Sequence, residues 1–71
     1  MVYFREIKKS EHYIKEHERD VPWSEVISVI FASSKHMRKK GSNFEIETEK
    51  HYVLCRLEGK ALIVTNAKRI R

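Results

Sequence analysis

The stretch VPWSEVISVIFASS, residues 21–34, decides how the rest of the chain is arranged. Pro22 suits the first position of a helix, where its missing N–H is not needed. A helix with one apolar stripe must bury that stripe against another element, so the remaining segments are expected to supply a sheet. The apolar residues with the i, i+3, i+4, i+7, i+8 spacing of an amphipathic helix are Trp23, Val26, Ile27, Ile30 and Phe31.

Another helix is expected immediately before this one, over residues 10–19. Ser10 is a typical N-cap residue. Glu11 follows it in the first turn, where the positive end of the helix dipole favours a carboxylate. The preceding segment VYFREIKK, residues 2–9, fits either a strand or a first helical turn.

The second half of the chain predicts three strands. Residues 43–49, NFEIETE, alternate and indicate a half-buried strand with an acidic outer face. Residues 51–58, HYVLCRLE, are more continuously apolar and suit a central strand, and a Gly-containing turn leads to ALIVTNA, residues 61–67. The order predicts an α+β fold in which two N-terminal helices pack on a three-stranded antiparallel meander.

Length and composition indicate one domain, residues 1–71, with a modest core. The single cysteine, Cys55, excludes an internal disulfide and fits a reducing compartment. The N-terminus is charged too early for a signal peptide, and no apolar stretch approaches the roughly 20 residues that span a bilayer. We therefore expect a soluble, cytoplasmic protein without membrane contact. High charge (35%) without glutamine is typical of thermophilic proteins.

A net charge of +5 favours nucleic acid or another anionic partner. The excess is local, in KHMRKKG at residues 35–41 and KRIR at residues 68–71. The first segment could instead complement a helix C-terminus, and the second could be a frayed tail. The side chains predicted to contact phosphate are Lys35, Arg38, Lys39, Lys40, Lys68 and Arg69.

The candidate catalytic residues lie on one face of the first helix. His12 and Glu16 are i, i+4 neighbours, and Arg19 lies one step further along that face. A carboxylate beside a histidine favours the imidazolium form and orients the ring, and an arginine can hold a phosphate. Such a set can serve RNA cleavage without a metal ion. The competing interpretation is an exposed face of solvated charges.

Neither a metal ion nor a cofactor is expected. His12 and His17 are five residues apart, so on a regular helix their side chains point about 140° away from each other. On that geometry they cannot share a metal ion, and His17 is expected to pack beside Tyr13 and Ile14. Tyr52 could stack a nucleic-acid base, but we expect it in the core.

Residues 10–30, SEHYIKEHERDVPWSEVISVI, resemble the opening of a family of short prokaryotic proteins of unknown function. That family has a helix with an early His and a late Glu-Arg, then an aliphatic residue and a second helix. Residues 52–69, YVLCRLEGKALIVTNAKR, resemble the closing hairpin of such domains. The chain departs from the family at Asp20, where glycine is usual. The matching residues of the first motif are His12, Glu18, Arg19, Val21 and Pro22.

This family is similar in layout to the BrnT and RelE/ParE toxins of toxin–antitoxin systems, many of which are metal-free ribonucleases. The resemblance implies a small toxin that cleaves RNA and is neutralised by a cognate antitoxin. His12 would then be the general acid or base, Glu16 its orienting partner and Arg19 a phosphate binder. The alternatives are a non-catalytic nucleic-acid-binding module, or an interaction domain that dimerises through the edge of strand 61–67 and has no RNA affinity.

Overall fold

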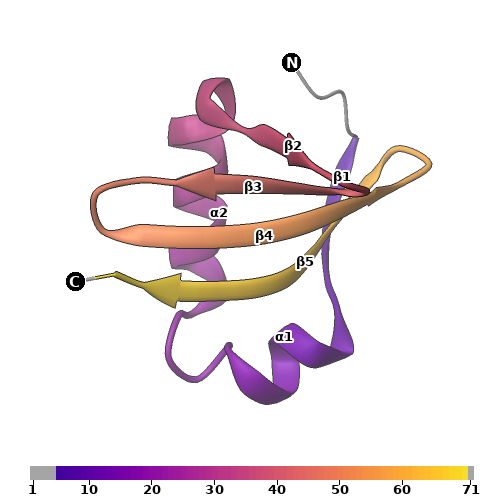
Figure 1. The fold of residues 1–71 in the computed structure, drawn as a ribbon. Helices are drawn as coiled ribbons and strands as arrows, with labels where there is room; N and C mark the ends of the chain where they lie inside the picture. Colours follow the sequence, from indigo (N-terminus) through magenta and orange to yellow (C-terminus); the bar gives the residue numbers. More distant parts are fainter. Residues whose placement is uncertain (1–4, 71) are drawn as a thin grey trace.

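A sheet forms the centre of the molecule, and two short helices lie against it (Figure 1). The computed structural model describes residues 5–70, so residues 2–4 of the predicted first segment and Arg71 lie outside the described residues. The elements in chain order are β1 (Glu6–Lys9), α1 (Glu11–Glu16), α2 (Trp23–Ser33), the 3₁₀ turn η1 (Ser34–His36), β2 (Arg38–Lys40), β3 (Asn43–Glu47), β4 (His51–Glu58) and β5 (Ala61–Arg69).

The sheet has five strands in the order β1-β5-β4-β3-β2. It is mixed, because β1 runs parallel to β5 while the other neighbours are antiparallel. The predicted fold, a three-stranded antiparallel meander under two N-terminal helices, is therefore wrong. The strands missing from that prediction are β1, which precedes the helices, and β2, which lies in the basic segment.

Neither of these two strands has a strong sequence pattern of its own. β1 has one half-buried apolar residue, Ile7, which lies opposite Leu62 of β5. All three residues of β2 are exposed, and Arg38 lies opposite Glu45 of β3. Opposite charges across an antiparallel pair stabilise it. Both strands therefore form because a partner strand is present, which a local pattern cannot reveal.

The last strand, β5, is internal. It lies between β1 and β4, and β1 pairs with the first part, Ala61–Val64, of the edge through which a dimer is predicted. The dimer itself stays a prediction. The edges of the described sheet are β1 and β2. The Arg-Lys-Lys sequence of β2 discourages edge-to-edge pairing, because like charges would meet.

Both helices contact the same face of the sheet, α2 against β3 and β4, and α1 against β5. Burial of each aliphatic side chain there contributes roughly 1.5–3 kcal/mol relative to exposure. The predicted stripe of α2 is shifted, because Val29 is buried whereas Phe31 is 67% exposed. The largest fully buried side chains are Tyr13, Ile30, Ile46, Leu62, Val21, Val26, Val53, Val64 and Cys55.

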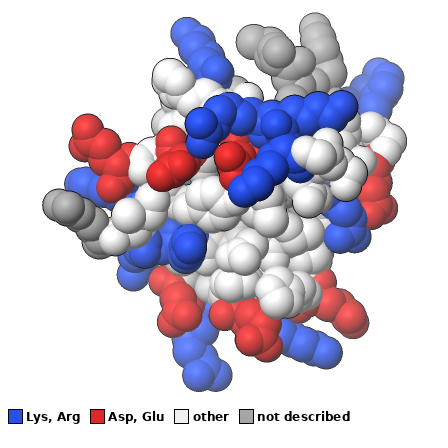
Figure 2. All heavy atoms as spheres, viewed as in Figure 1, with Lys and Arg blue, Asp and Glu red and all other residues white. Residues whose placement is uncertain are grey.

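No described element covers the opposite face of the sheet. Tyr52, which we expected in the core, lies on this face, and its hydroxyl donates a 2.7 Å hydrogen bond to Glu45. Figure 2 shows uncharged surface across the middle of the face and lysine and arginine along its upper border, over β2. Within residues 5–70, no helix combines the length and apolar character that crossing a membrane requires.

Candidate functional site

The two histidines of the first motif contact each other. Their Nε2 atoms lie 3.2 Å apart, and the rings meet edge to face with centroids separated by 4.9 Å. The expected separation of about 140° is wrong, because α1 ends at Glu16. His17 lies beyond the helix with φ −126° and ψ −26°, and its ring meets that of His12. His12 is exposed and His17 is half-buried.

A dense hydrogen-bond network fixes the backbone that carries this pair. The Ser10 hydroxyl caps α1 by accepting a 3.0 Å hydrogen bond from the N–H of Tyr13. The carbonyl of Tyr13 accepts from the N–H groups of His17 and the next residue, both at 2.8 Å. The Tyr13 hydroxyl then donates to the carbonyl of Val21 at 2.6 Å. Burial, and to a smaller extent the charge of nearby carboxylates, raise the pKa of Tyr13 to about 12.

His17 also lines a cavity of about 280 Å³ between the α1–α2 loop and the end of β5. This cavity brings two predicted phosphate binders, Lys68 and Arg69, to the side of the loop that carries the histidine pair. Asp20, Val21 and Ala67 complete its lining. The His17 imidazole and the Arg69 guanidinium at this hollow are groups that can contact a phosphate, and the Asp20 carboxylate beside them opposes an anion. The Lys68 ammonium itself lies over the Tyr52 ring, 5.4 Å from the ring centre.

Arg69 is held in place by a carboxylate that the sequence did not single out. Its Nε and Nη2 atoms each donate a 2.8 Å hydrogen bond to Glu25, in the first turn of α2. The same carboxylate lies 2.7 Å from Nε2 of His51. These hydrogen bonds lower the pKa of Glu25 to about 2, and the hydrogen bond from Arg69 has the larger effect. This contact could have been predicted only from the pairing of β4 with β5, in which His51 lies opposite Arg69.

The other predicted catalytic residues do not join the pair. Glu16 and Arg19 are exposed, and within residues 5–70 neither makes a hydrogen bond or ion pair with His12. His17, which we predicted to be a packing residue, takes the place that we assigned to Glu16. The reason is the early end of α1, since the i, i+4 relationship applies only while the helix continues.

The basic segment 35–41 lies at the far edge of the sheet from α1. β4 and β3 separate β5 from β2, so this segment does not converge with His12 (Figure 1). Arg38 forms ion pairs of 3.3 and 3.4 Å with Glu45 and Glu47, and Lys40 lies 3.9 Å from Glu45. These two predicted phosphate binders therefore lie beside the acidic face of β3, with their side chains still exposed.

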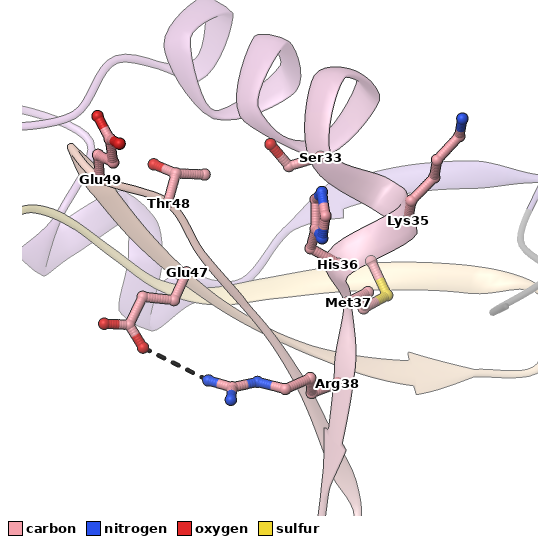
Figure 3. A pocket seen from close by; sticks show the side chains of 8 residues that line it. All are labelled: Ser33, Lys35, His36, Met37, Arg38, Glu47, Thr48 and Glu49. Atoms are coloured by element: carbon pink, nitrogen blue, oxygen red, sulfur yellow. Dashed lines mark hydrogen bonds and ion pairs between the residues drawn. The ribbon is translucent and has the colours of Figure 1, made fainter.

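A larger hollow of about 670 Å³ opens beside η1 (Figure 3). Lys35 and His36 stand on one side of it, and Thr48 and Glu49 stand on the other. The Arg38–Glu47 ion pair lies along its border. Because its walls carry charges of both signs, this hollow offers no concentrated site for an anion.

The described residues contain no group of three or more His, Cys, Asp or Glu side chains placed to hold a metal ion. The chain matches no protein-family model, no curated protein and no solved structure. Among the described residues, the histidine pair beside the cavity lined by Lys68 and Arg69 has the geometry best suited to a chemical reaction.

Proposed function

We propose that the protein is a metal-independent endoribonuclease whose general base and general acid are the paired imidazoles of His12 and His17. The observation that carries this proposal is the 3.2 Å separation of the two Nε2 atoms beside a cavity lined by Lys68 and Arg69. Once the two rings separate, a neutral imidazole can accept a proton through Nε2 and a protonated imidazole can donate one. These are the two functions that cleavage by the ribose 2′-hydroxyl requires.

In this mechanism the free imidazole removes the proton of the 2′-hydroxyl, whose oxygen attacks the adjacent phosphorus. The protonated imidazole donates its proton to the departing 5′-oxygen, and the products are a 2′,3′-cyclic phosphate and a free 5′-hydroxyl. The two rings separate to admit the phosphate, and the exposed side chain of His12 has room to move. The Arg69 guanidinium, held by Glu25, and the Lys68 ammonium, once it leaves the Tyr52 ring, supply positive charge for the phosphorane.

The experiment is RNA cleavage in the presence of EDTA. Purified protein should produce 2′,3′-cyclic phosphate ends, and His12→Gln and His17→Gln should each lower the cleavage rate by about 100-fold or more. His36→Gln is the matched control, because His36 is also exposed but lies beside β2. Cleavage that survives in the variant lacking both His12 and His17 would refute the mechanism.

A second function, nucleic-acid binding without cleavage, is favoured by the uncovered sheet face. Tyr52 lies there with the Lys68 ammonium 5.4 Å from its ring centre, and an aromatic ring beside a cation is suited to stacking a base near its phosphate. On this proposal Tyr52→Ala weakens RNA binding while the histidine variants leave it unchanged. Binding should also weaken with salt, because phosphate contacts release counterions.

A further inference from the structure

We propose that His12 and His17 form a bidentate site for a late first-row divalent metal ion such as Cu²⁺, Ni²⁺ or Zn²⁺. Two imidazoles bound through Nε2 to one tetrahedral ion at 2.0–2.1 Å have nitrogens about 3.3 Å apart and ring centres about 5 Å apart. The structure has 3.2 Å between the Nε2 atoms and 4.9 Å between the ring centres. Both distances therefore fit two Nε2 atoms that bind one ion.

The ligand set fixes the class of metal. Neutral imidazole suits copper, nickel and zinc, and the Irving–Williams order places Cu²⁺ as the tightest of these ions. Calcium and magnesium prefer oxygen ligands and are excluded by the same chemistry. Because His12 is exposed, water or a small chelator occupies the remaining coordination positions.

The backbone of the site is already organised for chelation. Ser10 caps the start of α1, and the Tyr13–Val21 hydrogen bond closes the loop that carries His17. Both histidines are thereby attached to fixed backbone, so metal binding orders little beyond the two side chains. This preorganisation distinguishes the pair from two histidines on a mobile segment.

Metal binding would also regulate the proposed ribonuclease, an extension that rests on the proposed function. A bound ion occupies both Nε2 lone pairs, so neither ring can accept the 2′-hydroxyl proton. Micromolar Zn²⁺ or Cu²⁺ should therefore inhibit RNA cleavage, and EDTA should restore it.

The test uses Cu²⁺ complexed with nitrilotriacetate, which leaves few open positions and favours sites that offer two ligands. Titration of the full chain should saturate at one complex per protein, and the electron paramagnetic resonance spectrum should show two imidazole nitrogens in addition to the amine nitrogen of nitrilotriacetate. His12→Gln and His17→Gln should each weaken binding at least tenfold, and His36→Gln and His51→Gln should not. Circular dichroism of each variant confirms folding.

A spectrum with fewer than two imidazole nitrogens, or affinity that is unchanged in either the His12 or the His17 variant, would overturn the site. The titration does not depend on RNA. If the protein binds the copper complex but cleaves no RNA, the metal site stands and the proposed function fails. If it cleaves RNA but binds no metal, the reverse holds.

Discussion

The hydroxyl of Tyr13 donates a 2.6 Å hydrogen bond to the backbone carbonyl of Val21, across the loop that joins the two helices. Both residues are essentially inaccessible to solvent. The bond therefore satisfies a buried carbonyl, and it holds the loop in the shape that turns His17 towards His12. Stability and site geometry depend on the same side chain.

Tyr13→Phe should lower the free energy of unfolding by about 1–3 kcal/mol, because the ring stays but the Val21 carbonyl loses its partner. Urea denaturation followed by circular dichroism measures this change. Tyr52→Phe is the control, since the Tyr52 hydroxyl lies on the uncovered face and water can replace its hydrogen bond to Glu45. Equal losses in the two variants would contradict the structural role of Tyr13.

Glu25 predicts a specific loss of stability in acid. Its pKa is lowered from 4.5 to about 2 in the folded protein, so the carboxylate stabilises the fold above the unfolded pKa. That contribution disappears as the pH falls from about 4.5 to about 2, where the folded state must also take up the proton. Glu25→Gln should be less stable than the wild type at pH 7, and the difference should shrink by pH 2.

Unfolding free energies at pH 7, 4 and 2 measure this effect. Glu47→Gln serves as the control, because Glu47 is exposed and shares Arg38 with Glu45. A wild-type pH profile parallel to that of Glu25→Gln would show that the Glu25–Arg69 pair does not stabilise the fold.

Cys55 should be unreactive in the native protein. It is fully buried in β4, and burial raises the pKa of its thiol to about 12. A thiol-specific reagent at pH 8 should therefore react rapidly in urea and only at the rate of structural opening in buffer. Val53→Ala, which leaves a cavity beside this part of the core, should accelerate labelling. Fast labelling of the wild type would show that β4 is open.

Toxicity is a separate prediction, drawn from the resemblance to toxin–antitoxin proteins. If the chain is a ribonuclease toxin, its induced expression in a bacterial host should arrest growth, and the variant lacking both His12 and His17 should not. His36→Gln should arrest growth like the wild type. Normal growth at verified expression of soluble wild-type protein would count against the toxin and leave RNA binding as the better function.

Local patterns predicted some parts of the fold and missed others for identifiable reasons. The strand expected over residues 51–58 coincides with β4, and Gly59 has the positive φ (61°) expected of its turn. β1 and β2 were missed because their short, charged sequences become strands only by pairing with β5 and β3. The alternation of apolar and polar residues within a segment does not indicate which distant strand the segment will pair with.

In the candidate site, too, some residues could be predicted from the sequence and others could not. His12, Lys68 and Arg69 were identified from residue type and charge, and the structure places the last two at the cavity that His17 lines. The roles of His17 and Glu25 were missed, since one depends on where α1 ends and the other on contacts with β4 and β5. Helical spacing is informative only for residues that remain in the helix.

The parallel pairing of β1 with β5 has a consequence for biosynthesis. β1 is made before its partner, so Ile7 cannot meet Leu62 until β5 has left the ribosome. Until then α1 lacks the strand that it contacts. Pairing between such distant segments is slow, because a long loop must close before any contact forms. The packing of β1 and α1 is therefore completed only after β5 has emerged.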